Sequence, residues 1–300
     1  MLKIAYSSTY SHHLPEGHRF PMEKYDILHS QLLYEGTAEL NNFFIPELLA
    51  ENIITTIHTS DYWYQLKNLL LSPAEVRASG FPHSYELIER ERIIAQGTLN
   101  CTLFALQYGV SANIAGGTHH SFTNRGEGFC LLNDLAMAAQ YLLDHKKYSK
   151  ILILDLDVHQ GNGTAEIFKN EKRVFTMSMH GEKNYPLRKE NSDLDIGLAD
   201  GTTDEEYLKK LAYHLPTIID IFEPQIIFYQ AGVDILITDK LGRLAVTHEG
   251  CKKRDEFVLK LAKKNKIPIV VTMGGGYSPK ISDIIEAHAN TFRAIQNIYF

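Results

Sequence analysis

Residues 151–159 read ILILDLDVH, an unbroken apolar run that passes directly into alternating acidic residues and a histidine. Such a run is typical of a central strand in a parallel sheet, because both faces of that strand are covered. If the extended geometry continues, Asp155, Asp157 and His159 project to one side, since strand side chains alternate with period two. Sites in parallel α/β sheets form beyond the carboxyl ends of the strands. The stretch therefore predicts a buried strand followed by a ligand-binding position.

The rest of the chain alternates between short β-rich runs and helical patterns. We predict further strands at 2–6, 53–57, 112–115, 173–177, 226–229 and 267–272. We predict helices at 22–35, 61–71, 86–108, 133–146, 162–169, 204–221, 248–264 and 279–298. This alternation indicates an α/β fold, with three α/β/α layers around a mostly parallel central sheet. No repeat or linker-like tract interrupts it, so we expect one domain over 1–300, with functional long loops at 7–21, 116–132 and 180–203.

Composition narrows the class of protein. The 300 residues include 30 Lys and Arg against 36 Asp and Glu, a net charge of −6, with 14 His and 3 Cys. A mildly acidic chain has no general attraction to nucleic acid or to anionic membranes, so neither is expected as a partner. Three scattered cysteines make neither a disulfide framework nor a thiolate zinc site, which leaves a metal bound by imidazole and carboxylate. With no signal sequence and no apolar run long enough for a membrane span, we expect a cytoplasmic location; secretion without a classical signal stays open.

Three other motifs also follow predicted strands. These motifs are GGTHH (116–120), YQAGVD (229–234) and MGGGY (273–277). Asp234 is a candidate third metal ligand beside Asp157 and His159, because catalytic zinc commonly has three protein ligands and one open position. The adjacent His119 and His120 are candidate acid–base groups, and the Tyr277 hydroxyl is a candidate hydrogen-bond donor. Each motif alone also fits a turn, a cap or simple packing, but four of them at one end of one sheet favour a site.

Taken together, these segments resemble the histone deacetylase superfamily, which has the arginase–deacetylase fold. The matching segments are HTSDYW (58–63), GGTHHSF (116–122), GEGFC (126–130), DLDVHQGNGT (155–164), SMH (178–180), YQAGVDIL (229–236) and GGGY (274–277). The details are most similar to class IV deacetylases and their bacterial relatives, notably DGTTDEEYLKKL (200–211) and the opening LPEGHRFPMEKY (14–25). The resemblance covers most of the chain.

The resemblance implies a role for each motif residue. One Zn²⁺ per chain, or Fe²⁺ or another divalent ion, would be bound by Asp157, His159 and Asp234. His119 and His120 would be the catalytic pair, and Tyr277 would polarise the substrate carbonyl. The other implied positions are the channel residues Gly128, Phe129 and Tyr185, the histidine partners Asp155 and Asn162, a K⁺ site near Asp155 and Ser178, and Arg19 near an inner cavity that releases the acid product.

The metal ligands and the histidine partners suggest which group activates water and which group accepts its proton. Two carboxylate ligands offset the metal charge and acidify bound water less than an all-histidine site would, so a separate base is useful. Resemblance pairs His119 with Asp155 and His120 with Asn162, where many family members have Asp. An amide orients the ring without stabilising imidazolium, so we expect His120 to stay neutral near pH 7.

The expected activity is hydrolysis that removes acetyl or longer acyl groups from lysine side chains of proteins or peptides. An alternative substrate is an acetylpolyamine or another small N-acyl amine. A binuclear arginase-like hydrolase is disfavoured, because position 161 is Gly where a second metal would need a carboxylate. A haloacid-dehalogenase-like phosphatase gives no role to the His pair or Tyr277, and an inactive scaffold should have lost one of these residues. Oligomeric state has no signature in the sequence.

Overall fold

The computed structural model describes residues 1–145 and 148–300. Its centre is one eight-stranded sheet with the order β2-β1-β3-β8-β7-β4-β5-β6, in which each neighbouring pair is parallel. The strands are β1 (Ile4–Ala5), β2 (Phe43–Phe44), β3 (Val110–Asn113), β4 (Ile151–Asp155), β5 (Val174–Gly181), β6 (Leu194–Leu198), β7 (Ile226–Gln230) and β8 (Ile269–Thr272). All carboxyl ends of the strands therefore point to the same edge of the sheet.

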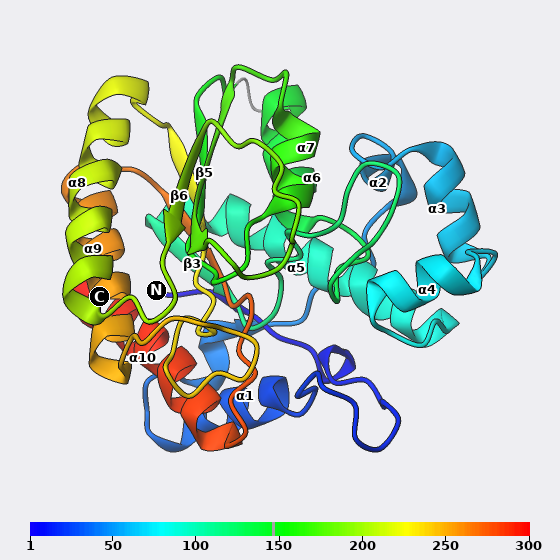
Figure 1. Cartoon of the computed structure of the whole chain (residues 1–300), viewed down its shortest axis with the longest axis horizontal. Helices are drawn as coiled ribbons and strands as arrows, with labels where there is room; N and C mark the ends of the chain where they lie inside the picture. Colours follow the sequence, from blue (N-terminus) through cyan, green and yellow to red (C-terminus); the bar gives the residue numbers. More distant parts are fainter. Residues whose placement is uncertain (146–147) are drawn as a thin grey trace.

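Helices cover both faces of this sheet (Figure 1). They are α1 (Lys24–Tyr34), α2 (Glu51–Ile54), α3 (Ser60–Lys67), α4 (Pro73–Ser79), α5 (Tyr85–Tyr108), α6 (Asp134–His145), α7 (Asn162–Phe168), α8 (Asp204–Phe222), α9 (His248–Lys264) and α10 (Ile281–Tyr299). Helices α8 to α10 and α1 form one layer, and α5 to α7 form the other, with α2 to α4 outside it. The observed architecture is the expected three-layer α/β/α fold with a parallel central sheet.

Burial explains why β4 occupies the interior of the sheet. Every residue of β4 is buried, and its neighbours β5 and β7 pair with it along its whole length. Edge strand β6 instead alternates between exposed and buried residues, because only one side of it packs on the core. The apolar run at 151–154 is thus placed where both faces of a strand are covered.

Most predicted elements are observed with shifts of a few residues at their ends. The strand predicted at 53–57 is wrong, because this segment begins in helix α2 and is not among the strands of the sheet that the described residues form. Strands β2 and β6 and helix α4 were not predicted, and β6 lies within the segment expected to be the long loop 180–203. The predicted end of a helix at residue 146 lies outside the described residues.

No helix within 1–145 or 148–300 combines the length and the apolar character needed to cross a bilayer.

Candidate active site

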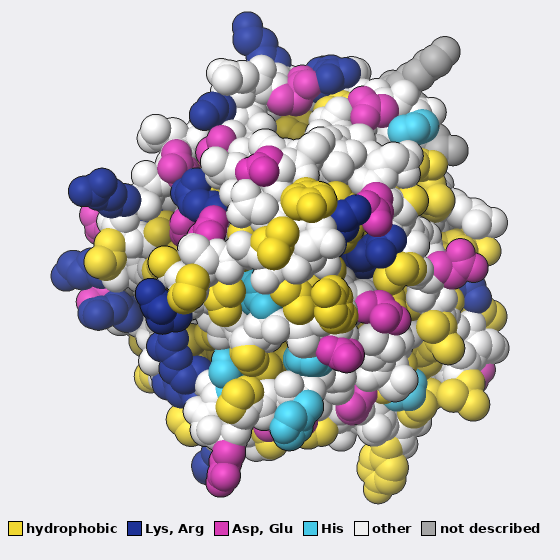
Figure 2. Space-filling model, turned by 90° about the vertical axis from the view of Figure 1, so that its right-hand side faces the viewer, with side chains coloured by type: hydrophobic (Ala, Val, Ile, Leu, Met, Phe, Trp, Pro, Cys, Tyr) yellow, Lys and Arg dark blue, Asp and Glu magenta, His cyan; other side chains and the backbone are white. Residues whose placement is uncertain are grey.

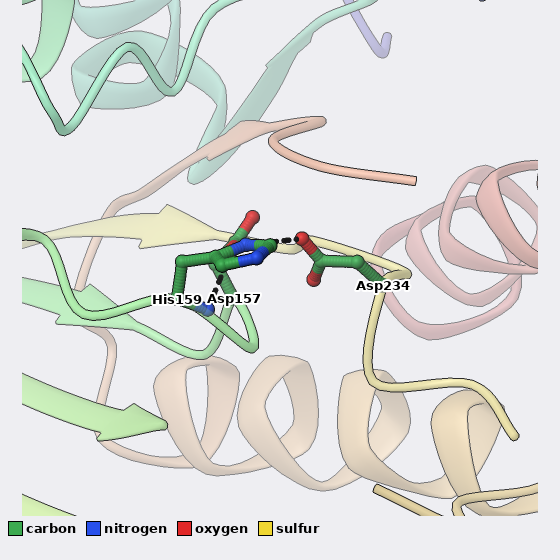
Figure 3. Close-up of side chains that lie close together, drawn as sticks. All are labelled: Asp157, His159 and Asp234. Atoms are coloured by element: carbon green, nitrogen blue, oxygen red, sulfur yellow. Dashed lines mark hydrogen bonds and ion pairs between the residues drawn. The ribbon is translucent and has the colours of Figure 1, made fainter. Parts of the chain in front are cut away.

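Three side chains that could hold a metal ion converge beyond the carboxyl ends of β4 and β7 (Figure 3). Asp157, His159 and Asp234 each offer a ligand atom, and these atoms all lie within 4.8 Å of one another. His159 Nδ1 lies 3.1 Å from Asp157 Oδ1 and 3.1 Å from Asp234 Oδ2. All three residues are buried. One nitrogen and two carboxylates at the end of a sheet are a donor set that suits zinc or another divalent ion.

Backbone groups hold the two carboxylates in position. Gly275 N–H donates to Asp157 Oδ2 at 2.8 Å, and Val158 N–H donates to Asp234 Oδ1 at 2.9 Å. A Cβ at Gly275 would lie 2.0 Å from Asp234 Oδ2, and one at Gly232 would lie 2.3 Å from Asp157 Oδ2. Only glycine allows the backbone to approach these oxygens so closely. The residues therefore fit a metal ion, because their donor atoms are pre-positioned before any ion binds.

The charges of these three residues support the same conclusion. Burial opposes a charge on His159, but its hydrogen bonds to Asp157 and Asp234 outweigh burial and raise the His159 pKa to about 10. Burial and the neighbouring charge of Asp157 raise the pKa of Asp234 to about 7. Two buried carboxylates this close need positive charge between them. A divalent ion or a proton on His159 would supply that charge.

The adjacent histidines lie beside the candidate ligands and have different partners. His119 Nδ1 donates to Asp155 Oδ2 at 2.6 Å, whereas His120 Nδ1 donates to Asn162 Oδ1 at 2.6 Å. Burial disfavours a charge on either ring. Asp155 and Asp157 outweigh burial at His119 and raise its pKa, while burial and the charges of the other imidazoles hold the pKa of His120 well below its usual value. The pair thus combines one ring that favours a proton with one that stays neutral.

The buried Asp134, which was not predicted as a site residue, holds the loop that carries His119 and His120 (the histidine loop). Asp134 accepts hydrogen bonds from Gly117 N–H at 3.1 Å, from Thr118 N–H at 2.8 Å and from Thr98 Oγ1 at 2.6 Å. Its side chain spans α5, the loop and the first turn of α6. The signal at this position was an acidic residue at the start of a helix, which ordinarily indicates a cap.

Tyr277 follows β8 and faces the same site. Its N–H donates to Asp239 Oδ2 at 2.6 Å, and its ring centroid lies 6.4 Å from that of His159. Burial and the neighbouring carboxylates raise the Tyr277 pKa well above its usual value, so the hydroxyl keeps its proton. Within the described residues the hydroxyl has no hydrogen-bond partner, which leaves it free to donate to a ligand. Asp239, also missed from sequence, orients this residue through the backbone.

The proposed channel residues line an open cavity of about 410 Å³ that leads to His120, His159 and Tyr277. Phe129 and Gly128 both have positive φ angles, and their N–H groups donate to carbonyls at the end of α4. On the other side, the Tyr185 ring stands edge-on to His120 with centroids 5.0 Å apart. Gly128, Phe129 and Tyr185 therefore line the same cavity as His120, and their role as a substrate channel stays a prediction.

A smaller inner cavity of about 40 Å³ lies at the site itself, because Arg90 lines it together with Asp157 and His159. Arg90 is buried and donates from Nε to Tyr10 O at 2.6 Å. Close by, the buried Lys24 donates to the carbonyl of the lining residue Gly274 at 3.2 Å. The expectation that Arg19 lies near an inner cavity is wrong, because Arg19 is exposed and lines the outer one. The path of its long loop depends on packing that has no local sequence signal.

Asp155 and Ser178 are register partners on β4 and β5. Asp155 accepts from His119 and from Asp157 N–H, and the Ser178 hydroxyl lies 2.9 Å from His180 Nδ1. A K⁺ site near this pair stays a prediction.

The chain belongs to the histone deacetylase family, because the histone deacetylase domain model matches residues 18–292. It is 40% identical to an uncharacterized protein of Picosynechococcus sp. over 99% of both chains. It is 28% identical to histone deacetylase 2 of Arabidopsis thaliana, covering 95% of this chain and 76% of that protein. The crystal structure of an HDAC homolog from Aquifex aeolicus has the same fold, with a TM-score of 0.84 at 22% identity over 99% of this chain and 84% of that one. Family membership makes the protein a deacetylase-type hydrolase.

Proposed function

We propose that the protein is a metal-dependent hydrolase that removes acetyl or longer acyl groups from lysine side chains. The observation that carries the proposal is the convergence of Asp157, His159 and Asp234 beside a histidine pair, at the base of an open cavity. One such group of ligands is found in the part of the chain that the structure describes, which favours one metal ion over the binuclear alternative. Zinc is the ion we expect, because the donor set has an imidazole nitrogen and an open position.

The proposed mechanism assigns one task to each group. A divalent ion bound there would acidify a water molecule and act as a Lewis acid toward the amide carbonyl. His120, neutral because of burial and its amide partner, accepts the proton of the attacking water through its free Nε2. His119, whose partner is Asp155, holds a proton beside it and stabilises the negative charge that develops.

Tyr277 would complete the site from the opposite side. Its hydroxyl stays protonated and has no partner among the described side chains, so it can donate to the developing oxyanion. The amine leaves with a proton from the histidine pair and departs through the outer cavity. Gly128, Phe129 and Tyr185 hold the extended chain that carries this amine.

The inner cavity favours a short acyl group. A cavity needs roughly 10–15 Å³ to hold one water, so a volume of about 40 Å³ supports an acetyl-sized group better than a long chain. Among acyl groups we therefore expect acetyl to be removed most efficiently.

A substrate panel tests this function. Peptides that carry acetyl- to myristoyl-lysine, together with acetylspermidine, are assayed with and without a chelator. We expect turnover of the acetyl-lysine peptide that stops on chelation and returns with added Zn²⁺. Asp234→Asn removes a candidate ligand and should abolish turnover, whereas the exposed Asp220→Asn on α8 makes the same chemical change and should not. If no substrate is hydrolysed in a chelator-sensitive way, the proposed function is wrong.

A further inference from the structure

The mouth of the outer cavity is basic, although the whole chain is acidic. The cavity is lined by fifteen residues, of which Arg19, Arg77, Lys183 and Arg243 are cationic and none is Asp or Glu. All four cationic residues are exposed. They come from four separate segments, including the 14–25 stretch and helix α4. In a protein with a net charge of −6, such a gathering at the entrance of the site is a local feature and not a consequence of composition.

Nearby carboxylates neutralise little of this charge. Asp200 lies 3.3 Å from Arg243 and 4.0 Å from Lys183, so one carboxylate serves two cations. Within the described ranges, neither Arg19 nor Arg77 has a carboxylate within 4.0 Å. Among the four cations, only Arg243 and Lys183 thus have a carboxylate within 4.0 Å, and they share it.

Glu127, which lies beside the cavity residue Tyr185, is already engaged. Glu127 accepts from Arg125 at 2.7 Å and from the Tyr185 hydroxyl at 2.7 Å, so it is paired with a cation of its own. The carboxylates of Asp157 and Asp234 would be balanced by a divalent ion. Figure 2 shows one face of the molecule, on which Lys and Arg side chains lie among Asp and Glu side chains and exposed hydrophobic ones.

We propose that this basic mouth selects acyl-lysine residues that are flanked by Asp or Glu in a peptide or protein. The inference rests on the proposed function and names the substrates that the same site prefers. A cleft lined by one sign of charge concentrates ligands of the opposite sign, and Arg pairs with carboxylates through two parallel hydrogen bonds. Within the described residues Arg19 and Arg77 have no carboxylate partner, so neither has to break an ion pair before it binds a carboxylate of the substrate. The same positive charge would repel acylpolyamines, which are polycations.

Three peptides test the proposal with the zinc-loaded full chain. Each has a central acetyl-lysine, flanked on both sides by Glu, by Gln or by Lys. At low salt (~50 mM) we expect kcat/KM for the Glu-flanked peptide to exceed that of the Gln-flanked one about fivefold, mainly through KM. The Lys-flanked peptide and acetylspermidine should be the poorest substrates. Raising the salt to ~0.5 M should bring the ratios toward one, because exposed charges are screened.

Matched variants locate the effect. Arg19→Gln combined with Arg77→Gln should reduce the Glu-to-Gln ratio to below about two. Lys209→Gln combined with Lys264→Gln removes the same charge from exposed positions on α8 and α9 and should keep the full ratio. The salt dependence of the unmodified protein tests the proposal even if the double variant folds poorly.

The possible failures are distinct. If the Gln-flanked peptide is hydrolysed in a chelator-sensitive way but the Glu-flanked one is no better at low salt, the basic-mouth proposal is wrong and the proposed function stands. Faster turnover of the Lys-flanked peptide or of acetylspermidine also overturns it, as does a ratio that survives loss of both arginines. If none of these substrates is hydrolysed, the proposed function fails and the selectivity fails with it.

Discussion

Asn162→Asp should move the pH dependence of catalysis in a direction that the structure fixes. Asn162 Oδ1 lies 2.6 Å from His120 Nδ1, so the substitution places a carboxylate in the same hydrogen bond. A hydrogen bond to a charged partner contributes about 1.5–3 kcal/mol, against about 0.5–1.5 kcal/mol for a neutral pair. The difference of about 1–1.5 kcal/mol corresponds to a rise of about one unit in the pKa of His120.

The sign of the change follows from the role of the ring. A neutral His120 accepts a proton, so activity is lost as the pH falls through its pKa, which burial and the other imidazoles hold well below the usual value. Raising that pKa moves the acidic limb of kcat/KM to higher pH by about one unit. A bound divalent ion lowers the pKa in both proteins and leaves the difference between them.

The assay is a pH profile of kcat/KM for an acetyl-lysine peptide with the zinc-loaded protein. Asn41→Asp is the matched control, because Asn41 is exposed, lies in a 3₁₀ turn remote from the site, and undergoes the same change of charge. Its profile should coincide with that of the unmodified protein. An acidic limb that stays in place in Asn162→Asp, while the protein remains folded, would refute His120 as the base.

Three further outcomes follow from the site. Tyr277→Phe should lower kcat by about 10²–10³ without changing Tm, because its hydroxyl makes no hydrogen bond to the described residues; full activity would remove its proposed role. Asp134→Ala leaves one buried and one partly buried N–H group without an acceptor and should lower the free energy of unfolding by roughly 2–5 kcal/mol, measured by urea denaturation; an unchanged midpoint would contradict this. Zn²⁺ added to chelator-treated protein at ~100 times its Kd should raise Tm by about 5 °C, and Asp234→Asn should abolish the rise. An equal rise in that variant would place the ion elsewhere.

The fold was predictable from sequence wherever burial left a strong local pattern. The apolar run that becomes β4 is one such case, and the long helices α5, α8 and α10 are others. Strand β2 has only two residues, which is too few for a recognisable pattern. Strand β6 lies at the edge of the sheet, and its exposed residues make its sequence resemble that of a loop. The β-branched residues near 53–57 indicated a strand, but a strand needs a neighbouring strand to pair with, and pairing is not a local property.

The residues of the candidate site also fall into those that could be predicted from the sequence and those that could not. Side chains such as Asp157, His120 and Tyr277 lie in the segments that follow strands, so their convergence could be argued from the parallel order of the sheet. Asp134 and Arg90 lie within or at the start of helices, where an acidic cap or a buried basic residue has many ordinary explanations. Their contacts with the histidine loop and with Tyr10 depend on how α5 and α6 pack, which no single segment encodes. The misplaced Arg19 has the same cause.

The position of β8 in the sheet has a consequence for how the protein must be made. This strand is the last of the eight to leave the ribosome, yet it lies between β3 and β7. Until residue 272 is available, β2-β1-β3 and β7-β4-β5-β6 have no strand to join them, and each half presents an unpaired edge open to association with other chains. The histidine pair follows a strand of one half, and the three candidate ligands follow strands of the other. The two halves of the site can therefore meet only after β8 has been made, and this strand completes the sheet.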